Sequence, residues 1–284
     1  MNDTTLLILI VIFFAVLAFI YRFFSNPYFF ARVIRFFLRF RYKVILDGFD
    51  EMMRAEHVLL MPNHPAYLDP ILLFEEIYAR NRKVSPMTDE KFFRNPAYRQ
   101  ILSLGDAVMV PDLMKNRSEA AVRQAASLVQ IAVKALEDGR SLVFYPSGHV
   151  TLDGKETIGN RRMAYETVSA IYSSPADSPL RQVRLFLLRT RGMETSRWSK
   201  SRPKLLHSSS ASPRAQQQDK CLNSCTPELL HSSLPWPLDN PGPFRRRRVV
   251  MHFEDMTDTL LEWSRKYDKA GFNHQLEEWY NRGN

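Results

Sequence analysis

The sequence predicts an α/β protein with a mixed, largely parallel sheet covered by helices, preceded by an N-terminal membrane helix and a basic amphipathic helix. Two observations carry this prediction. The chain begins with an uncharged apolar run, and after residue 43 short apolar runs alternate with amphipathic stretches. That alternation is typical of strands covered by helices. A length of 284 residues suits one sizeable core plus an anchor better than two full domains.

The apolar run from Thr4 to Tyr21 contains no charged residue. At about 1.5 Å per helical residue, it nearly crosses a hydrocarbon core of roughly 30 Å. A cleaved signal peptide is the alternative, but such peptides begin with basic residues, whereas this chain has Asp3 and no small-residue cleavage site. We therefore expect a membrane anchor.

Basic residues alternate with phenylalanines in the next segment, which suits a second helix lying in the membrane interface. The positive-inside rule then places the rest of the protein in the cytosol. An ordinary amphipathic helix docked on the domain is an equally good interpretation of this segment. The residues concerned are Arg22, Arg32, Arg35, Arg39, Arg41 and Lys43, with Phe23, Phe24, Phe29, Phe30, Phe36, Phe37 and Phe40 between them.

Apolar runs predict the strands of the sheet, and the stretches between them repeat apolar residues as helices do. The expected strands are 57–61, 83–88, 108–111, 141–145, 183–188 and 249–253, and the expected helices are 70–79, 118–138, 159–173 and 257–280. Residues 194–244 differ, because they are rich in serine and proline and have almost no periodicity. We therefore divide the chain into an anchor and interfacial helix (1–42), an α/β core (43–193), an insertion or disordered loop (194–244) and a C-terminal strand and helix completing the core (245–284).

Composition narrows the classes of partner. The two cysteines, Cys221 and Cys225, supply neither a disulfide framework nor a four-ligand metal site, and we expect no metal and no bound cofactor. The formal net charge of +9 favours an anionic partner, such as nucleic acid, an acidic membrane surface or a phosphorylated substrate. Because the basic residues are scattered without a nucleic-acid-binding module, we expect no nucleic acid.

Three of the expected strands end in unusual polar groups. The carboxyl ends of parallel strands lie on one edge of a sheet, where α/β proteins place their ligands. We therefore expect these groups to form one site. They are Asn63 and His64 after the first strand, Ser147 and Gly148 after the fourth, and Arg189 and Arg191 after the fifth.

His64 and Asp69 are the expected catalytic pair. A histidine titrates near neutrality and can take a proton from a hydroxyl, while a carboxylate on its other ring nitrogen fixes the tautomer. A turn histidine is the alternative for His64. For Asp69 the alternative is a helix N-cap, because Pro70 follows as a natural first helical residue. The two roles of Asp69 are compatible.

These residues resemble a known family. Asn63-His64 followed by Asp69 is similar to the NHx4D motif of the glycerolipid acyltransferases related to bacterial 1-acylglycerol-3-phosphate acyltransferase. Residues 105–112 stand where the second motif of that family, Gly-x-x-Phe-x-Asp-Arg, belongs, and residues 144–148 resemble its third, Phe-Pro-Glu-Gly. The resemblance covers residues 42–192. It implies an α/β domain and direct transfer of a fatty acyl group, without a covalent acyl-enzyme, from acyl-CoA or acyl-carrier protein.

The chain departs from the motifs at two positions that the family associates with binding the acceptor's phosphate and ordering the site. Leu113 replaces the arginine of the second motif, and Ser147 replaces the glutamate of the third. Guanidinium groups match phosphate bidentately, so we expect Arg189 and Arg191 to supply anion contacts. Lys91 and Arg94 are further candidates, and the alternative for each is a surface cation.

Together these observations predict a membrane-bound O-acyltransferase of phospholipid biosynthesis. Its partners would be the lipid bilayer, an acyl-thioester donor (acyl-CoA or acyl-carrier protein), and a lysophospholipid or 1-acylglycerol-3-phosphate acceptor. His64 would be the general base and Asp69 would orient it. Substrate would contact Asn63, Lys91, Tyr145, Pro146, Ser147, Gly148, Arg189 and Arg191, and backbone amides near residues 146–148 would stabilise the oxyanion.

Two other classes of function remain open. The first is a hydrolase with Ser147 as nucleophile and His64 or His149 as base. It lacks the Gly-x-Ser-x-Gly elbow, because Tyr145 occupies the first glycine position. The second is a non-catalytic, membrane-tethered binder of anions, suggested by the run Arg245 to Arg248 and the net charge.

Overall fold

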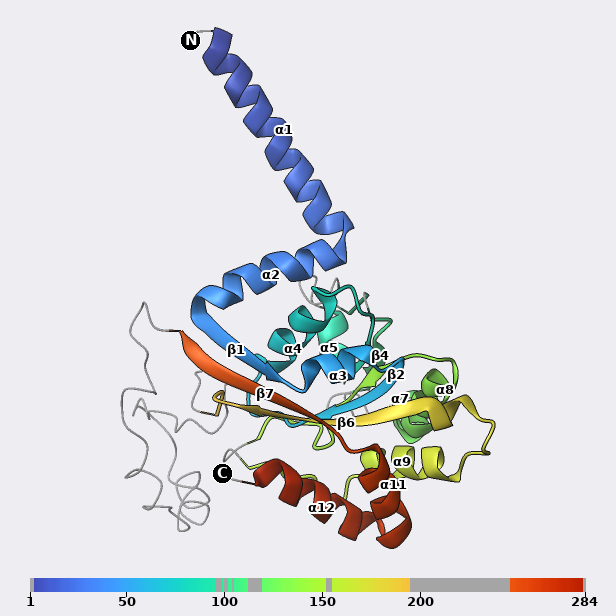
Figure 1. The fold of residues 1–284 in the computed structure, drawn as a ribbon. Helices are drawn as coiled ribbons and strands as arrows, with labels where there is room; N and C mark the ends of the chain where they lie inside the picture. Colours follow the sequence, from blue (N-terminus) through green and yellow to red (C-terminus); the bar gives the residue numbers. More distant parts are fainter. Residues whose placement is uncertain are drawn as a thin grey trace, which may run out of the picture.

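Two helices precede the sheet in the computed structural model, which describes residues 3–94, 99, 102, 103, 105–111, 119–151, 155–194 and 246–282 (Figure 1). Helix α1 (Asp3–Ser25) projects away from the rest of the molecule, and α2 (Pro27–Arg41) lies across it. Asn26 separates them, because its side-chain oxygen accepts a hydrogen bond from the Phe29 amide (3.0 Å) and so caps the second helix.

Helix α1 is long and apolar enough to cross a membrane by length and composition. Residues Thr4–Phe23 have a mean hydropathy of 2.8, and none of that window is buried against the protein.

Helix α2 has two different sides. Its Phe36, Phe37 and Phe40 are exposed, whereas Arg35 and Arg39 bind Glu76 on helix α4 (Asp69–Tyr78). The segment is therefore docked on the domain and still presents aromatic side chains outward.

The centre of the molecule is one seven-stranded sheet in the order β1-β7-β6-β2-β5-β3-β4. Every neighbouring pair is parallel except β6 and β7, which confirms the predicted mixed, largely parallel sheet. β2, β5 and β6 are parallel neighbours, so their carboxyl ends share one edge. The strands are β1 (Tyr42–Asp47), β2 (His57–Pro62), β3 (Ser85–Asp89), β4 (Val108–Val110), β5 (Leu142–Val143), β6 (Val183–Arg191) and β7 (Arg247–Asp255).

Helices cover both faces of the sheet (Figure 1). Alternate residues of a strand point to opposite faces, so β6 sends Phe186 and Leu188 to the core beneath α2 and α4, and Leu185 and Leu187 to the core beneath α8, α9, α11 and α12. The remaining elements are α3 (Phe49–Arg54), α4 (Asp69–Tyr78), α5 (Glu90–Phe93), α7 (Glu119–Ala126), α8 (Leu128–Glu137), α9 (Met163–Ser173), the 3-10 turn η1 (Pro179–Gln182), α11 (Thr257–Lys266) and α12 (Lys269–Asn281).

The structure corrects several expected elements. The expected strand 141–145 is only two residues long, and β1 was not expected. The expected helix 118–138 is interrupted at Ser127, and 257–280 is two helices separated at Asp268, whose side chain caps the second by accepting from the Gly271 amide. Residues 195–245 lie outside the described part of the chain, so the four-segment division stays a prediction. The C-terminal strand β7 pairs with both β1 and β6.

Candidate active site

The connection between β2 and α4 brings His64 and Asp69 together. β2 ends at Pro62, and α4 begins at Asp69 after a short loop. The His64 Nδ1 atom lies 2.9 and 3.2 Å from the two carboxylate oxygens of Asp69. A carboxylate only accepts, so Nδ1 carries the hydrogen and Nε2 is the ring nitrogen that can take a proton. Leu68 holds the N-cap position of α4, which has no side-chain cap bond. The alternative of Asp69 as an N-cap is therefore wrong.

The surroundings of this pair restrict its motion and its charge. The Asp69 side chain is 2% exposed and that of His64 is 16% exposed. Burial raises the pKa of Asp69 above its ordinary value, and the neighbouring His64 opposes that rise. The Tyr145 ring lies against the imidazole, with centroids 4.4 Å apart and planes inclined by 35°. Burial also raises the pKa of the Tyr145 phenol, so the phenol keeps its proton at neutral pH.

Asn63, expected to contact substrate, has a different role in the structure. Its side-chain oxygen accepts from the Thr190 amide (2.7 Å), and its side-chain amide donates to the Thr190 carbonyl (3.2 Å). Its own backbone amide donates to Leu188 (3.0 Å). These bonds extend the pairing of β2 with β6 by one residue, and so fix the start of the loop that carries His64.

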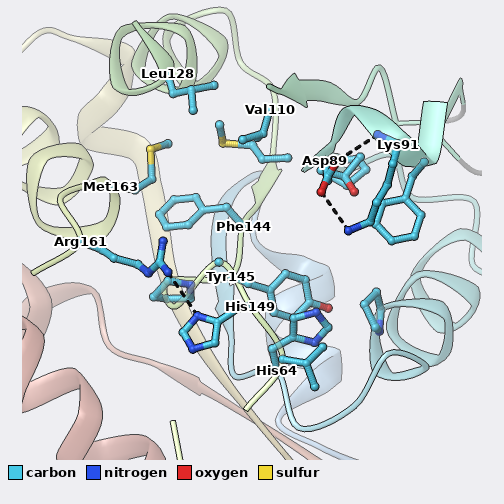
Figure 2. Close-up of a pocket in the computed structure, with 18 of the residues that line it drawn as sticks. His64, Asp89, Lys91, Val110, Leu128, Phe144, Tyr145, His149, Arg161 and Met163 are labelled. Carbon is cyan, nitrogen blue, oxygen red and sulfur yellow. Dashed lines mark hydrogen bonds and ion pairs between the residues drawn. The ribbon is translucent and has the colours of Figure 1, made fainter. Parts of the chain in front are cut away.

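A cavity of about 770 Å³ opens beside His64, within the usual size range of sites for small molecules. One part of its wall is apolar, and Figure 2 shows Val110, Leu128, Phe144 and Met163 grouped on the side away from His64. Tyr67, Pro146 and Gly148 also line it. Residues from α4, β3, β4, α8 and α9 thus form one space at the carboxyl edge of the sheet.

Cationic side chains stand at two places on the cavity wall. Arg161 and His149 lie together, and Lys91 lies across the cavity beside Asp89 (Figure 2). Lys91 forms an ion pair with Asp89, Nζ to Oδ2 2.9 Å. The His149 Nδ1 atom donates to the Ser147 carbonyl at 2.6 Å. The Arg161 guanidinium, 3.4 Å from that nitrogen, therefore makes no hydrogen bond to it, since both atoms carry hydrogen.

The segment 145–148 lines the cavity only in part. Ser147 is fully buried, and its hydroxyl donates a hydrogen bond to the His149 carbonyl (3.0 Å). The hydroxyl hydrogen is thus directed at a carbonyl oxygen, not at an imidazole nitrogen, which argues against the expected substrate contact and against a serine nucleophile. The Gly148 amide donates to the Tyr145 carbonyl (2.9 Å), and Pro146 has no N–H. Neither Pro146 nor Gly148 therefore offers a free backbone amide to an oxyanion, and the expected oxyanion contact near these residues stays a prediction for the Ser147 amide.

Arg189 and Arg191 do not line the cavity, which corrects the expectation that they bind the substrate's anion. β6 extends to Arg191, so its alternation puts both side chains on the face covered by α12. Arg189 donates to the Trp279 carbonyl (2.9 Å) and stacks over the Trp279 ring. Arg191 donates to the Arg282 carbonyl. Both arginines therefore bind the C-terminal end of α12, where cations are favourable.

Three residues of the site were missed by sequence reasoning. Arg161 was assigned to a helix, but α9 begins only at Met163. Tyr67, between His64 and Asp69 in the sequence, had only its position to indicate it. Glu156 had no signal in the sequence, because the group that it contacts, the backbone amide of His64 at 3.1 Å, is 92 residues away in the chain.

Two other residues were named in the sequence analysis. Arg94, a further candidate for an anion contact, is a surface cation paired with Glu90. Leu113 lies outside the described residues.

Comparison with known proteins agrees with the resemblance drawn from the sequence. Residues 43–172 match the model of the Acyltransferase family. This stretch contains the His64–Asp69 pair and the segment 144–148 that the sequence analysis compared with the family's first and third motifs. The resemblance to the 1-acylglycerol-3-phosphate acyltransferase type is thereby confirmed.

Two individual proteins are similar to this chain. A 1-acyl-sn-glycerol-3-phosphate acyltransferase from Borreliella burgdorferi is 26% identical over 132 residues, which are 45% of this chain and 49% of the relative. The chain thus spans about half the length of the curated relative it matches. The crystal structure of the 1-acyl-sn-glycerophosphate (LPA) acyltransferase PlsC from Thermotoga maritima has a TM-score of 0.47 and 13% identity, over 92% of this chain and 80% of that one.

Proposed function

We propose that this chain transfers a fatty acyl group from a thioester to the free hydroxyl of a 1-acylglycerol-3-phosphate. The observation that carries the proposal is the His64–Asp69 hydrogen bond at the wall of a cavity that is apolar in one part and cationic in another. A lysophosphatidate has the same two parts, a fatty chain and a phosphate. The match of residues 43–172 to the Acyltransferase family and the similarity to a 1-acyl-sn-glycerol-3-phosphate acyltransferase support the same substrate class.

The reaction uses one imidazole for both proton transfers. The acceptor hydroxyl gives its proton to Nε2 of His64 as its oxygen attacks the thioester carbonyl carbon. The tetrahedral intermediate then expels the thiolate, which takes the same proton from the imidazolium. Asp69 holds the Nδ1–H and stabilises the imidazolium between the two steps. No covalent acyl-enzyme and no metal take part in this sequence.

The acceptor's phosphate is proposed to bind Arg161, with Lys91 as a second cation. Arg161 lines the cavity near His149 and has an exposed side chain, so its planar guanidinium is accessible for a bidentate contact with phosphate. Lys91 is partly neutralised by Asp89. The acyl chain would occupy the apolar part near Phe144 and Leu128, where each buried methylene contributes about 0.8 kcal/mol.

The membrane is proposed to supply the acceptor. Helix α1 would insert in the bilayer, and α2 would lie at its surface with Phe36, Phe37 and Phe40 toward the lipid. The positive residues flanking α1 favour a cytosolic domain, where acyl-CoA or acyl-carrier protein is the donor. This arrangement brings lysolipids to the domain by diffusion within the membrane.

The test is a transfer assay with the purified full chain in vesicles. Radiolabelled acyl-CoA or acyl-carrier protein would be offered with 1-acylglycerol-3-phosphate or with a monoacylglycerol that lacks the phosphate. We expect labelled phosphatidate and little label on the monoacylglycerol. Equal labelling of both acceptors would contradict the phosphate site, and release of free fatty acid without transfer would contradict the acyltransferase. A serine-directed phosphonate is expected not to label Ser147.

A further inference from the structure

Behind His64 lies a buried carboxylate that the mechanism above does not use. The Glu156 side chain is 3% exposed, and its Oε2 atom accepts the backbone N–H of His64 at 3.1 Å. The Thr151 amide donates to the His64 carbonyl at 2.9 Å. Both backbone polar groups of His64 are therefore bound by the segment that follows the third motif.

Glu156 is itself fixed from two directions. Its backbone amide donates to the side-chain oxygen of Asn281 (2.9 Å), and its carbonyl accepts from the Asn281 side-chain amide (3.0 Å). The Ser147 hydroxyl lies beside its carboxyl group and lowers the pKa of that group. Position 147 is a glutamate in the motif this stretch resembles, whereas here the serine supports an acidic group that comes from position 156. The backbone of Glu156 is bound by Asn281 and its carboxylate is bound by the His64 amide. These contacts hold the carboxylate in one position beside His64.

The charges around Glu156 are those of the proposed reaction centre. Its ionisable neighbours are His64, Asp69, Tyr145 and Tyr280, and the other polar groups in contact with it, on Ser147 and Asn281, are neutral. Burial raises the pKa of Glu156 from 4.5 to about 7, while the Ser147 hydroxyl, the hydrogen bond from the His64 amide and the charge of His64 oppose the rise. A negative charge on Glu156 is thus costly when His64 is neutral and favourable when His64 is an imidazolium.

We propose that Glu156 is a positioning residue for His64, whose carboxylate holds the backbone of the base and whose negative charge stabilises the imidazolium formed when His64 takes the acceptor's proton. The role deepens the proposed acyl transfer and rests on it. It also explains how the C-terminal helix α12 contributes to the site, since Asn281 is its last residue and holds Glu156 in place.

The variant Glu156→Gln separates charge from packing, because its side-chain oxygen can still accept the His64 N–H. Glu277→Gln is the matched control. Glu277 binds the amides of Ile158 and Gly159 in the same segment, at 2.6 and 2.7 Å, so the control makes the same chemical change without removing the acid that contacts His64. Both variants would be made in the full chain in detergent micelles.

The first measurement is the NMR titration of the His64 ring nitrogens, assigned by the signal lost in His64→Gln. We expect Glu156→Gln to lower the midpoint of the His64 titration by about one pH unit, as for removal of a unit charge a few ångströms away. Glu277→Gln should leave it unchanged. The acid limb of the kcat/KM profile should move in the same direction, with kcat reduced and KM nearly constant.

The outcomes separate this inference from the proposed function. An unchanged His64 midpoint in Glu156→Gln would overturn the inference even if acyl transfer is found. A shifted midpoint in a protein without acyl transfer would uphold the charge coupling and reject the function. If Glu156→Gln does not fold, Ser147→Ala replaces it. Loss of the Ser147 hydroxyl should raise the pKa of Glu156 and lower the His64 midpoint by a smaller amount, and no shift would overturn the inference.

Discussion

Two adjacent glutamates on α4 should respond to the same substitution with opposite signs. Glu75 and Glu76 are both buried, 3% and 0% exposed. Glu76 binds three arginines, Arg35, Arg39 and Arg80. By contrast, neither carboxylate oxygen of Glu75 has a hydrogen-bond partner within the described part of the chain. Burial, followed by the charge of Glu76, raises the pKa of Glu75 from 4.5 to about 8.

The raised pKa of Glu75 determines the sign and the size of its contribution to the pH dependence of the free energy of unfolding. Between pH 4.5 and about 8 the folded protein holds a proton on Glu75 that the unfolded chain has lost. The free energy of unfolding therefore falls as the pH rises through this window, and it levels off above the folded pKa. Because one pKa unit corresponds to about 1.4 kcal/mol, the total loss is about 5 kcal/mol at most. Glu75→Gln removes the charge and should recover most of it.

The assay is thermal unfolding of the full chain in detergent micelles at pH 5.5 and pH 8.5. Glu75→Gln should raise Tm relative to wild type at both values, and by several degrees more at the higher pH. Glu76→Gln is the matched control, and it should lower Tm at both values because three guanidinium groups lose their carboxylate. A Glu75→Gln benefit that is equal at the two pH values, or a lower Tm at pH 8.5, would refute the reasoning.

Three further predictions follow from the site and the fold. Asp69→Asn should lower kcat by about 10²–10⁴-fold with little change in KM, because the amide no longer favours the Nδ1–H tautomer of His64; an unaltered kcat would contradict the pairing. Arg161→Gln should raise the KM for 1-acylglycerol-3-phosphate about tenfold while the exposed control Arg265→Gln does not, and equal KM values would exclude Arg161 as the phosphate ligand. Gly48→Ala should destabilise the fold by more than about 1 kcal/mol in denaturant unfolding, because Gly48 has φ +70° and an added Cβ would lie 2.1 Å from the Phe253 carbonyl oxygen; wild-type stability would show that the turn can relax.

The hydrogen-bonded pair of His64 and Asp69 was predictable because it is local. His64 follows the buried apolar strand β2, and Asp69 is the first residue of the next helix, α4. Only a short loop separates the two residues, so both lie at the same edge of the sheet. The sheet was predictable for a similar reason, since strand residues such as Leu185 to Leu188 form an unbroken apolar run that predicts burial on both faces.

The errors of the sequence-based prediction concern features that depend on residues far apart in the chain or on single capping bonds. The direction in which Arg189 and Arg191 point depends on β6 continuing to residue 191 beside β7, which is more than fifty residues away along the chain. Glu156 lies in an irregular segment without periodicity, and only its contact with His64 identifies it. The helix boundary at Asp268 depends on a capping bond that competes with a continuous amphipathic pattern.

The central claim is that one imidazole, oriented by Asp69, moves the proton of the acceptor hydroxyl. The most direct measurement compares wild type with His64→Ala in vesicles that contain 1-acylglycerol-3-phosphate and a radiolabelled acyl thioester. We predict that the variant loses phosphatidate formation while it remains folded and bound to the membrane. Phosphatidate formation at the wild-type rate by His64→Ala would contradict the account.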